Sequence, residues 1–264
     1  MGKHTAIISN VWQRALGYRF TMYTYRIGEL GETLLLVVMW TALFADRSII
    51  NGYTLKEMIT YVLVGNLIGF ITRNFLSELI AQEIKNGTLS IFLVKPISYF
   101  RYVLTREVGR VTLPFLMSLV SQLAIMLFFI DRLLFNKNLL TLGMMSIIIV
   151  LAFVIELLLG YLVGLIAFWT DEVDGLYTTI SRLKKFFSGG YFPLAILPTS
   201  YLTISYALPF AYSLFVPTQL YLGKISLITA WKGIGVQCLW IVVLYAIIML
   251  VWRRGIRKYE GVGI

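Results

Sequence analysis

Long apolar stretches, separated by charged or turn-forming residues, recur along the whole chain and constrain its fold more than any other feature. Residues 111–130 and 234–252 carry no charge, and 139–169 is interrupted only by Glu156. As helices rising about 1.5 Å per residue, such stretches cross a hydrocarbon core about 30 Å thick. The chain is 59% hydrophobic and 14% charged, whereas soluble domains are about half apolar and about a quarter charged. The sequence therefore predicts an all-α membrane protein.

The charges that bound the apolar stretches predict about six transmembrane helices. The predicted spans are 27–45, 55–73, 111–130, 139–169, 176–195 and 234–252. The fifth is the weakest, because Arg182, Lys184 and Lys185 interrupt it. Before the first span, apolar residues at helical spacing predict an amphipathic interfacial helix over 1–25. The whole chain, 1–264, is then a single transmembrane domain.

Lysine and arginine collect in three regions of the chain: before the first span, between the second and third spans, and after the last span. Loops rich in these residues stay on the cytoplasmic side. All three regions lie on that side only if the number of spans is even, which favours keeping the fifth span. We therefore expect a multi-pass protein of the cell membrane with both termini in the cytoplasm.

The net charge of +10 does not predict nucleic-acid binding, because the basic residues flank apolar stretches as membrane anchors do. One cysteine, Cys238, and one histidine, His4, cannot build a Cys/His metal site. The phosphate-binding G-x-x-x-x-G-K-[ST] pattern is absent, as are the G-x-S-x-G and H-E-x-x-H hydrolase motifs. We expect no enzymatic activity, cofactor or metal in this chain, and membrane lipids as its surroundings.

The loop between the second and third spans, 76–107, has the pattern of two short amphipathic helices. The first one ends at Asn86-Gly87, where glycine supplies a left-handed residue. The second one ends at Lys95-Pro96, because proline disfavours helical geometry in the residue before it. The pattern predicts a firm cytoplasmic knob; the alternative is an ordinary connector that lies among the lipid headgroups.

Parts of this loop and two later segments resemble type-2 ABC transporter permeases, the membrane subunits of bacterial exporters. In the loop the similar runs are Glu-Ile-Lys-Asn-Gly-Thr-Leu at 83–89 and Leu-Val-Lys-Pro-Ile-Ser at 93–98. The later segments are Ser-Gly-Gly at 188–190 with the prolines that follow it, and the basic tail at 253–259. The resemblance covers nearly the whole chain, and the order and spacing of its parts fit the predicted topology.

The resemblance implies that the permease dimerises with an identical or related permease and that its loop helix docks on a cytoplasmic ATPase, present in two copies. ATP and Mg would be bound by that partner. The implied cargo is a hydrophobic or amphipathic compound, such as a drug, a peptide or a lipid, which is exported. The residues to which the resemblance gives the coupling role are Glu83, Gly87, Thr88, Leu89 and Pro96.

Charges inside predicted spans mark candidate positions on the translocation path, since an ionised side chain in the membrane needs a partner or water. Glu156 either lines the path or pairs with a basic residue of a neighbouring helix, for which Arg182, Lys184 and Lys185 are the candidates. The alternative is a protonated or hydrogen-bonded structural glutamate at a helix contact. Arg182 and Lys185 share a helical face. If that face lines a cavity it favours anionic or zwitterionic cargo; otherwise these residues lie among the headgroups.

Residues 189–224 are apolar and aromatic but are interrupted by prolines, so that no single helix can cover them. Irregular backbone at membrane depth needs cover from protein or a water-filled cavity, which predicts short re-entrant helices. The resemblance places them at the outer mouth as a gate; the alternative is an interfacial loop with an aromatic belt. The gate candidates are Gly189, Gly190, Pro193, Pro198 and Pro209.

Two other function classes remain open from the residues. An ion-coupled secondary transporter would use an intramembrane acid such as Glu156 to bind the ion. A membrane-embedded lipid-modifying enzyme would need His, Asp or Ser clustered at one depth, and the only histidine, His4, lies near the start of the chain.

Overall fold

The computed structural model describes residues 9–13, 17, 19–96, 98–170 and 173–259, and these are helical apart from loops and one short hairpin. The first part contains α2 (Arg19–Leu43), β1 (Ile49–Ile50), β2 (Tyr53–Thr54), α3 (Leu55–Thr72), α4 (Leu76–Lys85) and α5 (Leu89–Leu93). The middle contains α6 (Tyr99–Phe128), η1 (Ile130–Arg132), α7 (Leu139–Leu165), η2 (Ile166–Phe168) and α8 (Val173–Phe187). The last part contains η3 (Leu194–Ile196), α9 (Thr199–Ala207), η4 (Phe210–Ser213), α10 (Phe215–Tyr221) and α11 (Leu227–Lys258). The all-α prediction is confirmed.

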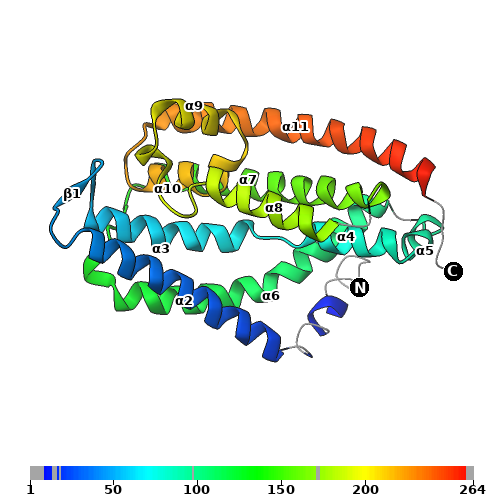
Figure 1. Cartoon of the computed structure of the whole chain (residues 1–264), viewed down its shortest axis with the longest axis horizontal. Helices are drawn as coiled ribbons and strands as arrows, with labels where there is room; N and C mark the ends of the chain where they lie inside the picture. Colours follow the sequence, from blue (N-terminus) through cyan, green and yellow to red (C-terminus); the bar gives the residue numbers. More distant parts are fainter. Residues whose placement is uncertain (1–8, 14–16, 18, 97, 171–172, 260–264) are drawn as a thin grey trace.

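The long helices run along the long axis of the molecule and give it two distinct ends (Figure 1). The β1–β2 hairpin lies at one end, with α9 and α10 nearby, and we call this the hairpin end. Helix α5 and the end of α11 lie at the opposite end, which we call the elbow end. Buried apolar residues of α4, α6, α7 and α11 form one core cluster toward the elbow end. Residues of α2, α3 and the hairpin form another cluster at the hairpin end.

Four segments of the described chain are long and apolar enough to cross a membrane: Leu55–Lys85, Tyr99–Phe128, Leu139–Phe168 and Leu227–Lys258. They correspond to the predicted second, third, fourth and sixth spans. The predicted spans 27–45 and 176–195 are not among them, and the total of six stays a prediction. Helix α2 contains the charged residues Arg26, Glu29 and Glu32, and α8 has only 15 residues, three of them basic.

Three predicted boundaries differ from the structure. The third long helix begins at Tyr99 instead of 111, so the last part of the predicted loop 76–107 belongs to α6. This extension is stable as a helix because Tyr99, Val103 and Glu107 recur at helical spacing and are buried. The last helix likewise begins at Leu227. Residues 1–8, 14–16 and 18 of the predicted interfacial helix lie outside the described residues, and its end from Arg19 belongs to α2.

Helix α4 lies close against α7 because two glycines of α7 leave room for it. A Cβ atom at Gly164 would lie 2.7 Å from the Cβ of Ile80 and 3.0 Å from the carbonyl oxygen of Ser77. Gly160, one turn earlier, faces the side chain of Asn74 in the same way. Small residues four apart let helix backbones approach closely in membranes, where packing contributes most of the association energy. This Gly160–Gly164 pair was not among the features predicted from the sequence.

Residues 189–224 form the short helices η3, α9, η4 and α10, as the prolines predict. Pro193, Pro198 and Pro209 each directly precede one of them. Proline is well tolerated at a helix start, where its missing N–H would have no partner. That these helices are re-entrant and line the outer mouth stays a prediction.

We expect Gly164→Ala to lower the free energy of unfolding by about 1–3 kcal/mol, because its methyl group would overpack the α4–α7 contact. Gly143→Ala is the matched control, since a Cβ there meets nothing within 4 Å; with its better helix propensity, we expect it to be neutral or stabilising by up to about 1 kcal/mol. Denaturant unfolding in detergent micelles measures both. Equal effects of the two substitutions would contradict the close contact.

Candidate functional site

A polar cavity of about 370 Å³ lies inside the bundle, beside the break between α3 and α4. Its volume is within the range of about 300–1,000 Å³ that is typical of ligand sites. Its walls come from α2, α3, the α3–α4 break, α7, α8 and η4. The charged residues in the lining are Glu29, Glu32, Arg73, Glu156, Lys184 and Lys185.

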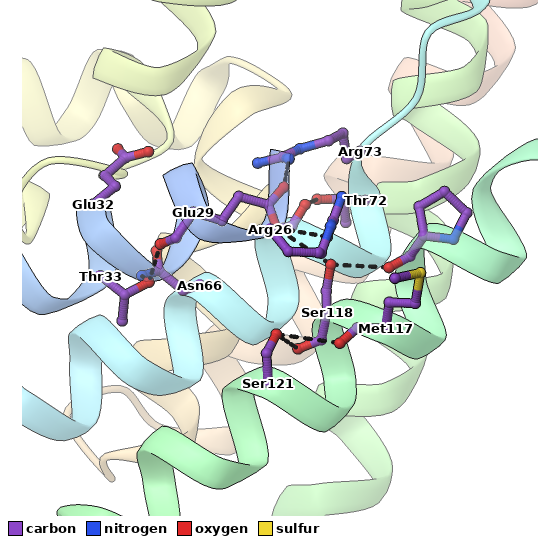
Figure 2. Close-up of polar contacts among 12 residues, drawn as sticks. Arg26, Glu29, Glu32, Thr33, Asn66, Thr72, Arg73, Met117, Ser118 and Ser121 are labelled. Atoms are coloured by element: carbon purple, nitrogen blue, oxygen red, sulfur yellow. Dashed lines mark hydrogen bonds and ion pairs between the residues drawn. The ribbon is translucent and has the colours of Figure 1, made fainter. Parts of the chain in front are cut away.

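Glu29 of α2 is the centre of one charged cluster in the lining, shown in Figure 2. Its carboxylate is 2.5 Å from Nη1 of Arg26 and also pairs with Arg73. The Ser118 hydroxyl of α6 donates a hydrogen bond to it at 3.4 Å. One turn further along α2, Thr33 accepts a hydrogen bond from the Asn66 amide at 3.0 Å. Polar contacts thus fix α2 to α3 and α6.

Glu156 of α7 is 3% exposed and joins three parts of the chain. Its carboxylate pairs with Lys184 of α8 and accepts a hydrogen bond from the Ser213 hydroxyl of η4 at 2.8 Å. Its backbone carbonyl accepts a hydrogen bond from the Asn74 amide at 3.0 Å. Lys184 is one of the three basic partners that the sequence predicted for Glu156, so that pairing is confirmed. Its role in a translocation path stays a prediction.

The three basic residues of α8 lie in different surroundings. Lys185 lines the cavity and pairs with Glu32 of α2, and its ammonium group lies 4.8 Å from the ring centre of Tyr191. Lys184 lines the cavity as well. Arg182 is exposed and is not in the lining. The helical spacing grouped Arg182 with Lys185. In the structure, Lys184 and Lys185 border the cavity and Arg182 does not.

The cavity is directly connected to α4 through the residues of the α3–α4 break. The Asn74 side chain donates a hydrogen bond to Glu156 as described, and its amide oxygen Oδ1 accepts a hydrogen bond from the Leu76 backbone N–H at 3.3 Å. The Glu107 carboxylate of α6 accepts a hydrogen bond from the Phe75 amide at 2.6 Å. Both side chains satisfy backbone N–H groups at the start of α4, which would otherwise lack partners. The start of α4 is thereby fixed to the cavity wall.

The residues that the resemblance assigns to coupling divide into two groups. Glu83, Gly87 and Leu89 are buried, whereas Thr88 and Pro96 are exposed. Gly87 has the positive φ of 70° that the sequence predicted for the end of α4. We use the term elbow for residues 76–96, which contain α4, α5 and the turn at Gly87.

Glu83 holds the elbow to the first turns of α6. Its two carboxylate oxygens accept hydrogen bonds from Tyr99 Oη and Arg106 Nη1, each at 2.6 Å. The tip of the elbow is different, because Ile91, Leu93 and Val94 are exposed, Val94 to 84%. The elbow therefore combines a buried polar anchor with an exposed apolar tip.

Among the gate candidates, the two glycines lie closest to the cavity. Gly190 lines it, and the carbonyl of Gly189 accepts a hydrogen bond from the Tyr61 hydroxyl at 2.8 Å. Gly189 has a φ of 79°, a left-handed conformation that favours glycine. Pro193, Pro198 and Pro209 are not in the lining.

A model of the family described as ABC-2 family transporter protein matches residues 30–263. The chain belongs to this family. No curated protein matches its sequence. As an ABC-2 family member, it is a multi-pass permease subunit of an ABC transporter and works with an ATPase partner.

The described part of this permease holds no group of three or more His, Cys, Asp or Glu side chains that could bind a metal ion. The charged side chains that line its cavity make ion pairs and hydrogen bonds with one another and with neighbouring residues. Sequence reasoning missed Glu29, Glu32 and Arg73 as site residues. The signal that could have found them is that Glu29 and Glu32 are carboxylates within a predicted span, which need a basic partner in the bundle.

We expect Lys184→Met to lower the free energy of unfolding by about 1–3 kcal/mol, because the buried Glu156 carboxylate loses its cation. The double variant Glu156→Gln/Lys184→Met should lose less than Lys184→Met alone, because no unpaired charge is left in the bundle. Arg182→Met, on the same helix but outside the cavity, is the control and should change stability by no more than about 0.5 kcal/mol. Denaturant titration provides the measurements. Equal losses of unfolding free energy for Lys184→Met and Arg182→Met would contradict the ion pair.

Proposed function

We propose that this permease exports a hydrophobic or amphipathic compound, of which drugs, peptides and lipids are examples, by alternating access of its polar cavity. It functions with two ATPase copies, which bind ATP and Mg, and with a second permease, identical or related. The chain crosses the cell membrane of a bacterium about six times, with both termini and the elbow end in the cytoplasm.

One observation supports the coupling route most strongly: the elbow is tied both to the bundle and to the cavity. Its base is fixed by Glu83 to α6, and its tip exposes an apolar surface that a protein partner can cover. Asn74 joins the start of α4 to the backbone of Glu156 in the cavity wall. A force applied to the tip is thus transmitted through α4 to the residues around the cavity.

The transport proposal is tested by reconstituting the permease with its ATPase in liposomes. The expected result is accumulation of a hydrophobic or amphipathic dye that depends on ATP hydrolysis. Transport by the permease alone, driven by an ion gradient, would instead support the secondary transporter and overturn the proposal.

We expect Val94→Glu to weaken binding of the ATPase about tenfold or more, because a carboxylate would be buried without a partner at the docking surface. Ile49→Glu is the matched control: Ile49 is also an exposed apolar residue, 61% against 84% for Val94, but it lies in the hairpin at the other end. It should leave binding unchanged. Co-purification of the tagged permease with the ATPase measures both. If the Val94→Glu variant binds the ATPase normally, the elbow tip is not part of the docking surface.

The orientation is tested with single cysteines in a Cys238→Ser background. We expect Ile49→Cys to react with a membrane-impermeant maleimide in intact cells, whereas Val94→Cys should react only after permeabilisation. Both positions are exposed, so that the membrane alone should decide their reactivity. Labelling of Val94→Cys in intact cells would place the elbow outside and overturn the coupling proposal.

A further inference from the structure

The cavity has a balanced set of charges. Among the described residues that line it, three are carboxylates and three are cations, and each carboxylate pairs with a different cation of the lining. The pairs are Glu29–Arg73, Glu32–Lys185 and Glu156–Lys184. Arg26, which also contacts Glu29, is outside the lining. The cavity is thus highly charged but close to neutral in total.

This balance selects between classes of ligand. A headgroup with a net charge would leave one charge of the cavity, or its own charge, without a partner in a region where unpaired charges are costly. An uncharged headgroup would gain no ionic contact. A zwitterionic headgroup can replace one ion pair with two new pairs, so that every charge keeps a partner of the opposite sign.

The Glu32–Lys185 pair is the one best suited to such an exchange. Its side chains are 51% and 37% exposed, whereas the Glu156 side chain of the Lys184 pair is 4% exposed. Both charged groups are therefore accessible from the cavity, and a ligand that supplies a partner to each of them can replace their mutual contact. The pair also bridges α2 and α8, and both of its residues line the cavity.

An apolar surface adjoins the same position. Leu35 lies one helical turn after Glu32 and is 71% exposed, and Met39, two turns after Glu32 on the same face, is 41% exposed. A ligand whose charged headgroup contacts Glu32 can therefore place an apolar tail along α2. The charged cavity and the apolar face of α2 together match an amphiphile.

We propose that the cavity binds the zwitterionic headgroup of an amphiphile, with its anionic group at Lys185 and its cationic group at Glu32. This inference rests on the proposed transport function and specifies its substrate class. In this proposal Glu32 of α2 and Lys185 of α8 recognise the headgroup, whereas the Glu156–Lys184 pair stabilises the cavity wall.

The test measures binding to the purified full-length permease in dodecyl maltoside. Three probes with the same tail compete against a fluorescent lysophosphatidylcholine: dodecylphosphocholine, dodecyltrimethylammonium and dodecyl phosphate. We expect the wild-type permease to bind the phosphocholine about tenfold more tightly than either charged probe. Equal or tighter binding of a charged probe, or no binding of any probe, would overturn the proposal.

Two single substitutions then shift the preference in opposite directions. Glu32→Gln leaves Lys185 without its carboxylate and should favour dodecyl phosphate, whereas Lys185→Gln should favour dodecyltrimethylammonium. Arg182→Gln removes a charge from the same helix outside the cavity and should keep the wild-type order. A change of preference cannot result from misfolding, which would weaken all three probes. If both cavity variants keep the wild-type order of the three affinities, the headgroup binds at another site and the proposal is wrong.

These measurements need neither ATP nor the ATPase. A negative result therefore removes the zwitterionic substrate class but leaves ATP-driven export in place. Failure of dye transport in the reconstituted complex, with the headgroup preference intact, would remove the proposed function and retain the binding site.

Discussion

Pairing of opposite charges within an apolar bundle is the interaction on which the positions of α2 and α8 depend. Both helices carry charges that need a partner of opposite sign inside an apolar bundle. Arg73 provides the partner for Glu29, and Lys184 provides the partner for Glu156. Neither α2 nor α8 is among the segments of the described chain that could cross a membrane by composition alone. Their place in the bundle therefore follows from ion pairs as well as from apolar packing.

Close helix packing provides a second constraint, and it connects the elbow to the cavity. Gly160 and Gly164 let α4 approach the backbone of α7 more closely than larger residues would allow. The same approach brings Asn74 within hydrogen-bonding distance of the Glu156 carbonyl. A movement of α4 must therefore either carry the cavity wall with it or break this contact. This hydrogen bond therefore connects the elbow side of the break directly to the cavity wall.

Features that depend on neighbouring residues in the chain were predicted well from the sequence. Apolar length identified four of the membrane-crossing segments, and the glycine at 87 and the prolines after 189 identified turns and helix starts. These features depend on neighbouring residues only, so that spacing and turn chemistry are sufficient to find them.

Contacts between distant residues could not be predicted in this way. Arg73 was taken as the end of a span, yet it pairs with Glu29 of another helix. Helical spacing grouped Arg182 with Lys185, but the cavity borders α2 on one side and α7 on the other, so that Lys184 and Lys185 both face it. The coupling role that the resemblance gives to Glu83 stays a prediction, but the sequence did not indicate that its carboxylate binds Tyr99 and Arg106. In each case the tertiary arrangement decides which partner a charge meets.

The unequal burial of the ion pairs also indicates which helices separate most easily. Glu156 and Lys184 join α7 to α8 with one partner almost fully buried, and breaking such a pair is costly. Glu32 and Lys185 join α2 to α8 with both partners substantially exposed, so that this pair is less enclosed by protein than the Glu156–Lys184 pair. If the bundle opens, the difference favours separation of α2 from α8 over separation of α8 from α7. The most exposed ionic contact in the cavity lining is therefore the one that joins α2 to α8.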